Sequence, residues 1–181
     1  KIKDSSTNKK IIFSGSFSRF NEDRNLDFLL NAFKSSELSD YQLEIIGGST
    51  KEVDDLRNKV DKLKIKNVKI SNRVSRKNLA KKLQEFEFGI LLNSNKNTHS
   101  VKYTSPLKFF EFISVGLKVI AIDFPAHRVL PNQDNIFFFM EDNKNDFINA
   151  IKLAEKTKFK DISLQNISLE ERTKEIYNLF G

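Results

Sequence analysis

The fold is decided by residues 105–123, Ser-Pro-Leu-Lys-Phe-Phe-Glu-Phe-Ile-Ser-Val-Gly-Leu-Lys-Val-Ile-Ala-Ile-Asp. Ser105 predicts a helix N-cap, and Pro106 suits the first helical position because its missing N–H would be unpaired there in any case. Apolar residues then recur at helical spacing until Gly116, which predicts the end of the helix. Residues 118–122, which are apolar after Lys118, predict a buried strand. A capped helix followed by a buried strand is one repeat unit of an α/β fold.

The same alternation extends in both directions along the chain. Strands are predicted at 11–13, 41–46, 68–70, 86–92, 118–122 and 135–140. Helices are predicted at 25–33, 49–63, 76–85, 105–116, 146–156 and 168–180. Residues 93–103 are predicted to be a polar loop without periodicity. About six strand–helix alternations predict an α/β domain with a doubly wound, Rossmann-like parallel sheet and helices on both faces.

The predicted domain covers residues 1–181 as a single unit. We expect residues 1–9 to be a linker from a preceding N-terminal domain. Ser49 and Glu52 have the spacing of a capping box and open the helix predicted at 49–63. Ser168 and Glu171 have the same spacing and open the last predicted helix.

Composition excludes several classes of protein. The chain has no Cys and two His, so a disulfide scaffold, a Cys-ligated zinc site and a multi-His metal centre are disfavoured. No apolar run approaches the roughly 20 residues of a membrane span. The 31 Lys and Arg against 24 Asp and Glu give a net charge of +7. This excess is compatible with an anionic partner or with a solvated Lys-rich surface. Nucleic acid is disfavoured because the cations are dispersed.

Two strand ends carry candidate site residues, because ligands of open α/β sheets bind beyond the carboxyl ends of the strands. In the first, Gly15 makes a turn and is followed by Arg19 and Arg24, and Arg suits phosphate recognition. In the second, Lys108 and Glu111 lie three residues apart at the start of a helix, whose free N–H groups can hold a phosphate. Read alone, the two stretches favour an ordinary turn and an ordinary surface ion pair over a binding site.

The ordered set of motifs resembles the C-terminal half of GT-B glycosyltransferases, specifically the retaining "glycosyl transferases group 1" family. That family has a Ser-Pro-x-Lys segment that leads into a helix with Glu and Gly and then a strand that ends on Asp, as in residues 105–123 here. Similar correspondences are the Gly turn at 13–16, the segment Arg24-Asn25-Leu26, the strand 43–48 and Val74. The resemblance covers nearly the whole chain.

This resemblance implies the donor-binding half of a glycosyltransferase that moves a sugar from a UDP- or GDP-linked donor to a glycan or lipid-linked acceptor. The implied donor-binding residues are Gly15, Ser16, Arg19, Arg24, Val74, Ser105, Leu107, Lys108 and Glu111. Arg24, with Arg19 as a helper, would contact the diphosphate, and the N–H groups of Leu107 and Lys108 would hold its distal phosphate. Glu111 would bind the ribose hydroxyls, and Val74 would lie beside the base. No metal, no other cofactor and no certain catalytic residue are implied in this domain.

One position departs from the family pattern. The family often carries two Glu eight positions apart, and here the first falls on Tyr103, so Tyr103 and Thr104 become candidate contacts to the donor sugar. A non-catalytic module that binds a nucleotide or a protein on the same fold therefore remains an alternative. His127 follows the strand that ends at Asp123 and lies near the predicted cleft, but a surface loop position is expected for it. His99 lies in the loop before Tyr103, which could close over the donor sugar.

The resemblance also implies a partner and a location. The acceptor site of the family lies mostly in an N-terminal domain, for which this chain has no room, so the chain alone is expected to bind donor but to turn over little. Bacterial cell-surface polysaccharide synthesis in the cytoplasm is the implied setting. The inner face of the membrane, reached by peripheral contact through the parent protein, is the alternative.

Overall fold

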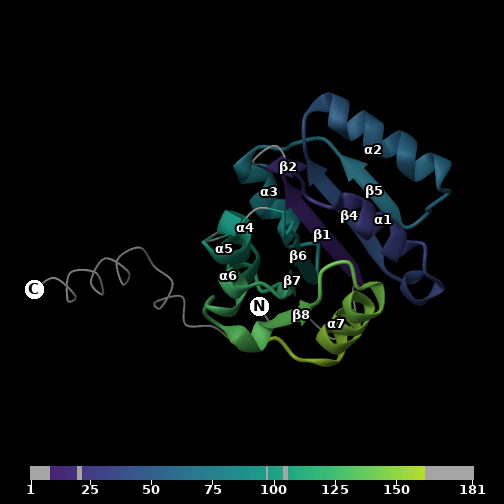
Figure 1. The fold of residues 1–181 in the computed structure, drawn as a ribbon. Coiled ribbons are helices and arrows are strands. Elements are labelled where there is room, and N and C mark those ends of the chain that lie inside the picture. Colours follow the sequence, from purple (N-terminus) through teal and green to yellow (C-terminus); the bar gives the residue numbers. More distant parts are fainter. Residues whose placement is uncertain (1–8, 20–21, 97, 104–105, 162–181) are drawn as a thin grey trace, which may run out of the picture.

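The computed structural model describes residues 9–19, 22–96, 98–103 and 106–161. A six-stranded parallel sheet has the order β5-β4-β1-β6-β7-β8 (Figure 1). Its strands are β1 (Lys10–Gly15), β4 (Gln42–Gly47), β5 (Val68–Ser71), β6 (Phe88–Leu91), β7 (Lys118–Ile122) and β8 (Ile136–Phe139). The predicted doubly wound, Rossmann-like sheet is therefore confirmed.

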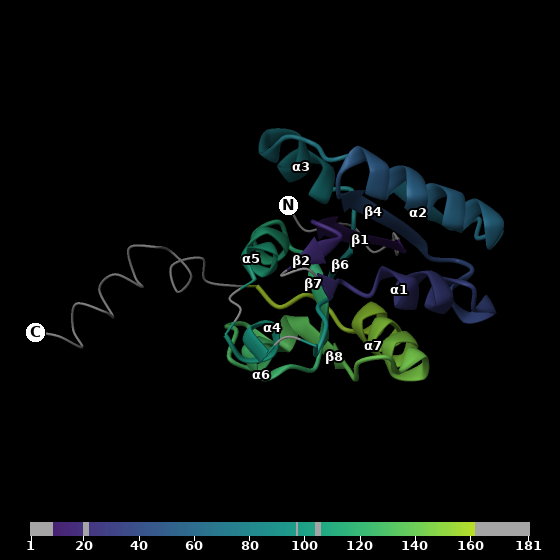
Figure 2. The ribbon, with the colours of Figure 1, turned by 45° about the horizontal axis from the view of Figure 1, so that its top comes forward.

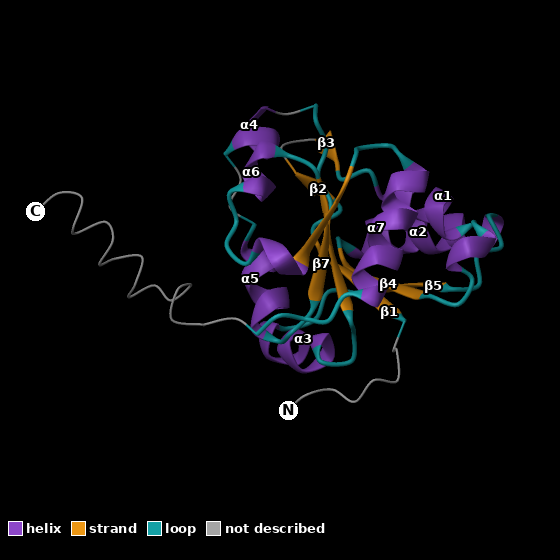
Figure 3. Cartoon of the chain, turned by 90° about the horizontal axis from the view of Figure 1, so that it is seen from below, coloured by secondary structure: helices purple, strands orange, loops and turns teal. Residues whose placement is uncertain are grey.

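Helices cover both faces of the sheet (Figure 3). On one side lie α1 (Leu26–Phe33), α2 (Thr50–Lys62) and α7 (Lys144–Lys156). On the other side lie α3 (Arg76–Leu83) and α5 (Leu107–Ser114). The predicted capping box begins α2: the Ser49 N–H donates to Glu52 Oε2 at 2.7 Å, and the Glu52 N–H donates to Ser49 Oγ at 3.4 Å. Among the described residues, no helix is both long and apolar enough to cross a membrane.

Alternation along each strand divides the core into two layers. On β1, Ile11 and Phe13 join the layer under α1, α2 and α7, whereas Ile12 joins the layer under α3 and α5. In the first layer, the ring of Phe139 lies 5.8 Å from that of Phe28 and 4.9 Å from that of Phe147, which ties β8 to α1 and α7. The central strands β6 and β7 are buried along their whole length and are nearly continuous hydrophobic runs, as expected for strands covered on both faces.

Helix α5 packs directly on β6 at Gly89. A Cβ placed on Gly89 of β6 would lie 2.4 Å from Cδ2 of Phe112 on α5, so the absent side chain makes room for the aromatic ring. Phe112 has no exposed surface, and Gly89 is buried as well. The distance between α5 and the sheet is thus determined by a ring lying on a bare stretch of strand backbone.

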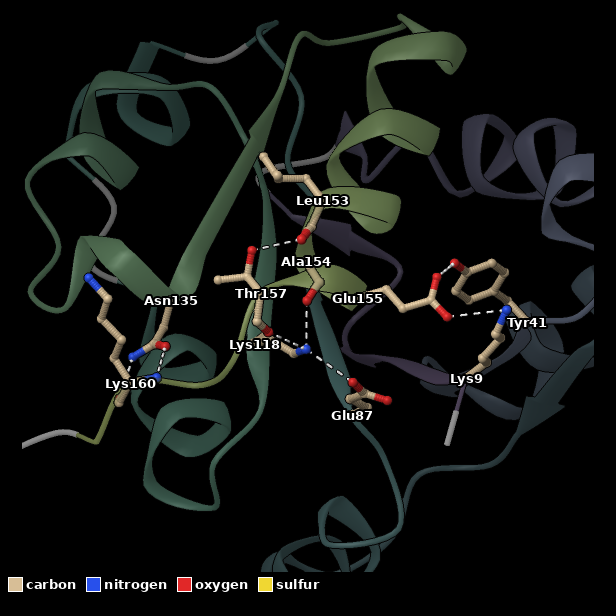
Figure 4. A network of polar contacts seen from close by, with 10 residues as sticks. All are labelled: Lys9, Tyr41, Glu87, Lys118, Asn135, Leu153, Ala154, Glu155, Thr157 and Lys160. Carbon is tan, nitrogen blue, oxygen red and sulfur yellow. Dashed lines mark hydrogen bonds and ion pairs between the residues drawn. The ribbon is translucent and has the colours of Figure 1, made fainter. Parts of the chain in front are cut away.

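A buried lysine joins α7 to the start of β7 (Figure 4). Lys118 Nζ lies 3.0 Å from Glu87 Oε1, 2.6 Å from the carbonyl oxygen of Ala154 and 2.9 Å from that of Thr157. The side chain is 7% exposed and also places its ammonium 4.9 Å from the centre of the Phe88 ring. These contacts satisfy the charge that burial would otherwise penalise, and they fix the C-terminal end of α7.

Several short elements and one helix start differ from the sequence predictions. The stretch predicted as a polar loop contains the helix α4 (Thr98–Lys102), a second short helix α6 (Pro125–Arg128) follows β7, and β2 (Ser18–Arg19) pairs with β3 (Glu22–Asp23). Pro106 is the N-cap of α5 rather than its first residue, since its backbone is extended, with φ −78° and ψ 105°. Elements this short carry too little periodicity to be read from the sequence. The predicted last helix at 168–180 and residues 1–8 of the predicted linker lie outside the described residues.

Candidate functional site

The strand order creates one crevice at the centre of the sheet. From β1 the chain builds outward to β4 and β5, then crosses β1 and builds in the other direction through β6, β7 and β8. The loops that leave β1 and β6 therefore diverge, and doubly wound sheets bind ligands at this switch point.

A cavity of about 250 Å³ lies at the switch point. Its lining comes from the ends of β1 and β6, from the start of α5, and from α6 beyond the neighbouring strand β7. The lining residues are Phe13, Ser14, Arg24, Ile90, Leu91, Leu92, Asn93, Pro106, Leu107, Lys108 and His127. The volume is below the roughly 300–1,000 Å³ of pockets that enclose drug-sized ligands, so the cavity suits one part of an extended ligand.

One side of this cavity suits an anion. The first N–H groups of α5 have no carbonyl partner within the helix, and the helix dipole adds positive potential there. Lys108, on the first turn of α5, adds a full positive charge. Arg24 reaches the same cavity because the β2–β3 hairpin folds the chain back: its N–H donates to the Phe17 carbonyl at 2.9 Å, and a Cβ on Gly15 would lie 3.5 Å from its Nη1 atom.

Lys108 also pairs with Glu111. The Lys108 Nζ atom lies 2.6 Å from Glu111 Oε2, and both side chains are partly exposed. Glu111 is not among the lining residues, so its carboxylate lies beside the cavity, one turn along α5. The pair places a cation at the cavity and a hydrogen-bond acceptor next to it.

His127 is buried, which contradicts the expectation of a surface position. It has no exposed surface, and its Nδ1 lies 2.7 Å from the Ile122 carbonyl oxygen. Pro125 opens α6 directly after the sheet and turns the ring inward, where it stacks on Phe124 with ring centres 5.9 Å apart. Burial away from water lowers the pKa of His127. The sequence signal here was Phe124-Pro125, an apolar residue and a helix-opening proline at the end of a strand, which indicates the start of α6 but not the direction of the His127 ring.

The other residues predicted to bind the donor lie in different environments. Leu107 lines the cavity but is 72% exposed, and Ser16 is exposed. Val74 does not line the cavity; it is half-buried against the core layer under α3 and α5. Tyr103 is 70% exposed. Arg19 lies in β2, but its side chain is not described.

The remaining positions singled out from the sequence are Thr104, Ser105 and His99. Thr104 and Ser105 lie outside the described residues. His99 is exposed on α4, with its ring 6.0 Å from that of Tyr103. Helices α4 and α6 lie side by side (Figure 2), so His99 and His127 come from neighbouring elements although one is exposed and the other buried.

A second, wider cavity of about 600 Å³ lies nearby and has a different charge. Its lining includes six carboxylates and two lysines: Asp23, Asp27, Glu52, Asp55, Glu141, Asp142, Lys59 and Lys96. An excess of negative charge disfavours phosphate there, so the smaller cavity is the better anion site. Within the described part of the chain, no group of three or more His, Asp or Glu side chains is arranged to hold a metal ion.

The sheet order, the helices on both faces and the cavity at the switch point define a Rossmann-like α/β domain. The "Glycosyl transferases group 1" family model matches residues 8–155, and the chain belongs to this family. No curated protein matches the chain.

Solved glycosyltransferases of the GT-B fold share this architecture. The catalytic domain of cholesterol-alpha-glucosyltransferase from Helicobacter pylori is 17% identical with a TM-score of 0.55, and the match covers 93% of this chain and 94% of that one. A point mutant of S. aureus TarM, solved with Fondaparinux, alpha-GlcNAc-glycerol and UDP, is 16% identical with a TM-score of 0.66. The lipopolysaccharide outer core galactosyltransferase WaaB is 15% identical with a TM-score of 0.67.

The solved structures differ in how much of their own length aligns with this chain. The chain aligns over 96% of its length with TarM and 94% with WaaB, but it spans only 35% and 48% of those chains. The predicted family and fold are therefore confirmed, and the chain corresponds to one part of the two longer proteins.

Proposed function

We propose that this chain is the donor-binding half of a glycosyltransferase that takes a sugar from a nucleoside-diphosphate sugar. The observation that carries the proposal is the convergence of Arg24, Lys108 and the N-terminal end of α5 on one cavity at the switch point. Fixed donors and cations at one point are what a diphosphate leaving group requires, because negative charge develops on it as the glycosidic bond breaks.

The parts of the donor have separate places in this proposal. The diphosphate lies at the start of α5, between the N–H groups of Leu107 and Lys108 and the guanidinium of Arg24. The ribose hydroxyls donate to Glu111, beside the cavity, and Val74 approaches the base outside it. The residues present supply the charge stabilisation without a metal ion, so we propose metal-independent binding.

The acceptor is proposed to bind to another domain of the parent protein. Support comes from TarM and WaaB, of which the chain spans less than half. A role in bacterial cell-surface polysaccharide synthesis is supported by WaaB, which is named for the lipopolysaccharide outer core. A hexosyl donor linked to UDP or GDP fits this setting. The complex of TarM with UDP supports UDP as the nucleotide.

The alternative is a non-catalytic binding module, which Tyr103 favours because a phenol cannot replace the carboxylate that the family often carries there. Both functions bind nucleotide, so turnover distinguishes them. Transfer or hydrolysis of the donor by the parent protein supports the enzyme, whereas nucleotide binding without turnover supports the module.

Calorimetric titration with UDP, GDP and their hexose conjugates tests the donor site. We expect binding of one nucleoside diphosphate, with the same affinity in the presence of EDTA. Arg24→Gln is expected to weaken binding because it removes a charged contact to the diphosphate. Lys96→Gln, in the acidic cavity, is the matched control and should bind as the unsubstituted chain does. If the folded chain binds none of these nucleotides, the proposed function is wrong.

A further inference from the structure

The buried side-chain atoms Nε2 of His127 and Oγ of Ser14 have no hydrogen-bond partner among the described residues, and both residues line the switch-point cavity. His127 is fully enclosed, and Ser14 is 3% exposed. Buried polar groups are nearly always hydrogen-bonded, and an unpaired one at a binding site points to a group that the ligand supplies.

The hydrogen bond at the other ring nitrogen determines what His127 offers. A carbonyl oxygen only accepts hydrogen bonds, so Nδ1, at 2.7 Å from the Ile122 carbonyl, carries the proton. In the neutral imidazole, Nε2 is then a bare acceptor, and the lowered pKa of His127 favours this neutral form. Nε2 therefore requires a donor from the ligand.

The need of Nε2 for a hydrogen-bond donor is met by the sugar of the proposed substrate and not by its diphosphate. A diphosphate at neutral pH presents acceptor oxygens, which a bare Nε2 repels and which Lys108, Arg24 and the α5 N–H groups already suit. A sugar presents hydroxyl groups, each of which can donate to Nε2 and exchange hydrogen bonds with the Ser14 hydroxyl. The cavity volume of about 250 Å³ suits one such part rather than a whole nucleotide sugar.

We propose that His127 Nε2 and Ser14 Oγ bind hydroxyl groups of the transferred sugar and so contribute to the choice of sugar. This inference rests on the proposed function and adds the residues that recognise the sugar. His127 comes from α6 beyond β7 and Ser14 from β1, so the two contacts approach from opposite sides of β6. Neither residue carries a role in the proposed binding of the diphosphate or the ribose.

Paired substitutions at His127 test the contact. Asn places its amide close to the position of Nδ1, so His127→Asn keeps a donor for the Ile122 carbonyl and removes Nε2. His127→Gln reaches further and keeps a polar atom near the Nε2 position. We expect His127→Asn to weaken binding of the nucleotide sugar about 3- to 10-fold, as for loss of one neutral hydrogen bond, with less loss in His127→Gln.

The readout is the ratio of two affinities, measured by calorimetry for each variant. The probes are UDP with UDP-glucose, UDP-galactose and UDP-N-acetylglucosamine, and GDP with GDP-mannose. We expect the loss only for the nucleotide sugar, with the affinity for UDP or GDP unchanged. Ser14→Ala, a small change that is expected to leave the fold intact, should lower the same ratio about 2- to 5-fold. It keeps the test decisive if His127→Asn does not fold.

Three results would overturn the proposal. One is an equal loss for nucleoside diphosphate and nucleotide sugar, which would assign the two atoms to the phosphates. Another is unchanged binding in folded His127→Asn and Ser14→Ala, which would assign them to structure alone. The third is equal affinity of the unsubstituted chain for the nucleoside diphosphate and all of its sugars. Failure of the proposed function is distinct, because the unsubstituted chain would then bind no nucleotide at all.

Discussion

Gly47 lies so close to Gly15 that a Cβ on Gly47 would be 1.7 Å from the Gly15 carbonyl oxygen. The two residues are paired in register at the carboxyl ends of β4 and β1, and the next N–H, of Gly48, donates to the same carbonyl at 3.2 Å. The backbone of residues 47 and 48 therefore packs directly on the turn that leads from β1 to the switch-point cavity. This close packing leaves no room for a side chain at position 47.

Gly47→Ala is expected to lower the free energy of unfolding by more than about 3 kcal/mol. The φ of +142° is strained for Ala, at a cost of about 1–3 kcal/mol, and the Gly15 carbonyl must move as well. Gly116→Ala is the matched control: its φ is +81°, but nothing lies within 4 Å of the added Cβ, so only about 1–2 kcal/mol is expected. Urea unfolding measures both, and equal losses would contradict the steric argument.

Lys118→Met is expected to destabilise the fold by about 2–4 kcal/mol, because it leaves Glu87 and two carbonyl groups without their buried cation. The control is Lys152→Met, since Lys152 pairs with Glu37 at the surface and both side chains are at least 40% exposed. An exposed pair contributes at most about 1 kcal/mol. Thermal or urea unfolding should separate the two variants, and similar losses would mean that the Lys118 network is not stabilising.

Glu52 is expected to make stability depend on pH. Hydrogen bonds from the N–H and hydroxyl of Ser49 lower its pKa below the usual 4.5. A lowered pKa in the folded state means that the contribution is fully present above about pH 4.5 and is lost as pH falls through the folded value. The difference in unfolding free energy between the unsubstituted chain and Glu52→Gln should therefore be largest near pH 7 and shrink toward pH 3. In a Ser49→Ala background the same substitution should show a smaller pH dependence; an undiminished one would rule out the capping box as the cause.

Glu111→Gln tests the proposed ribose contact. Hydrogen bonds to a charged group contribute about 1.5–3 kcal/mol, so UDP or GDP should bind about 10- to 100-fold more weakly. Pyrophosphate, which has no ribose, should bind at least as well, because Lys108 loses its ion-pair partner at 2.6 Å and becomes available to the anion. Calorimetry with both ligands gives the comparison, and an equal loss for the two would mean that Glu111 acts on the phosphate side.

The regular part of the fold was predictable because its signals are local. Short apolar runs between predicted helices indicated the six sheet strands, and Ser49 with Glu52 predicted the cap of α2. The short elements α4, α6 and the β2–β3 hairpin were missed, since two to five residues do not define a period. Pro106 was assigned to the wrong helix position because Ser and Pro in sequence allow two starts one residue apart.

The candidate site was only partly predictable. Lys108 and Arg24 were identified from sequence, and the structure brings both to the cavity. Val74 does not reach it, because β5 is at the edge of the sheet, two strands from β1. His127 was expected at the surface, since nothing in its neighbours along the chain reveals that α6 turns the ring into the interior. Its place depends on contacts between elements distant in sequence.

The contact between Gly89 and Phe112 has a consequence for how such a domain can change during evolution. Helix α5 presents its N-terminal end to the cavity, yet its height above the sheet is determined by an aromatic ring on the bare backbone of β6, in the enclosed core. Adding a single methyl group at Gly89 would press on the Phe112 ring and shift α5, together with the proposed anion-binding end, without altering any residue that lines the cavity. The affinity and selectivity of the proposed donor site could thus be changed from the interior of the domain, where a comparison of lining residues alone would find no difference.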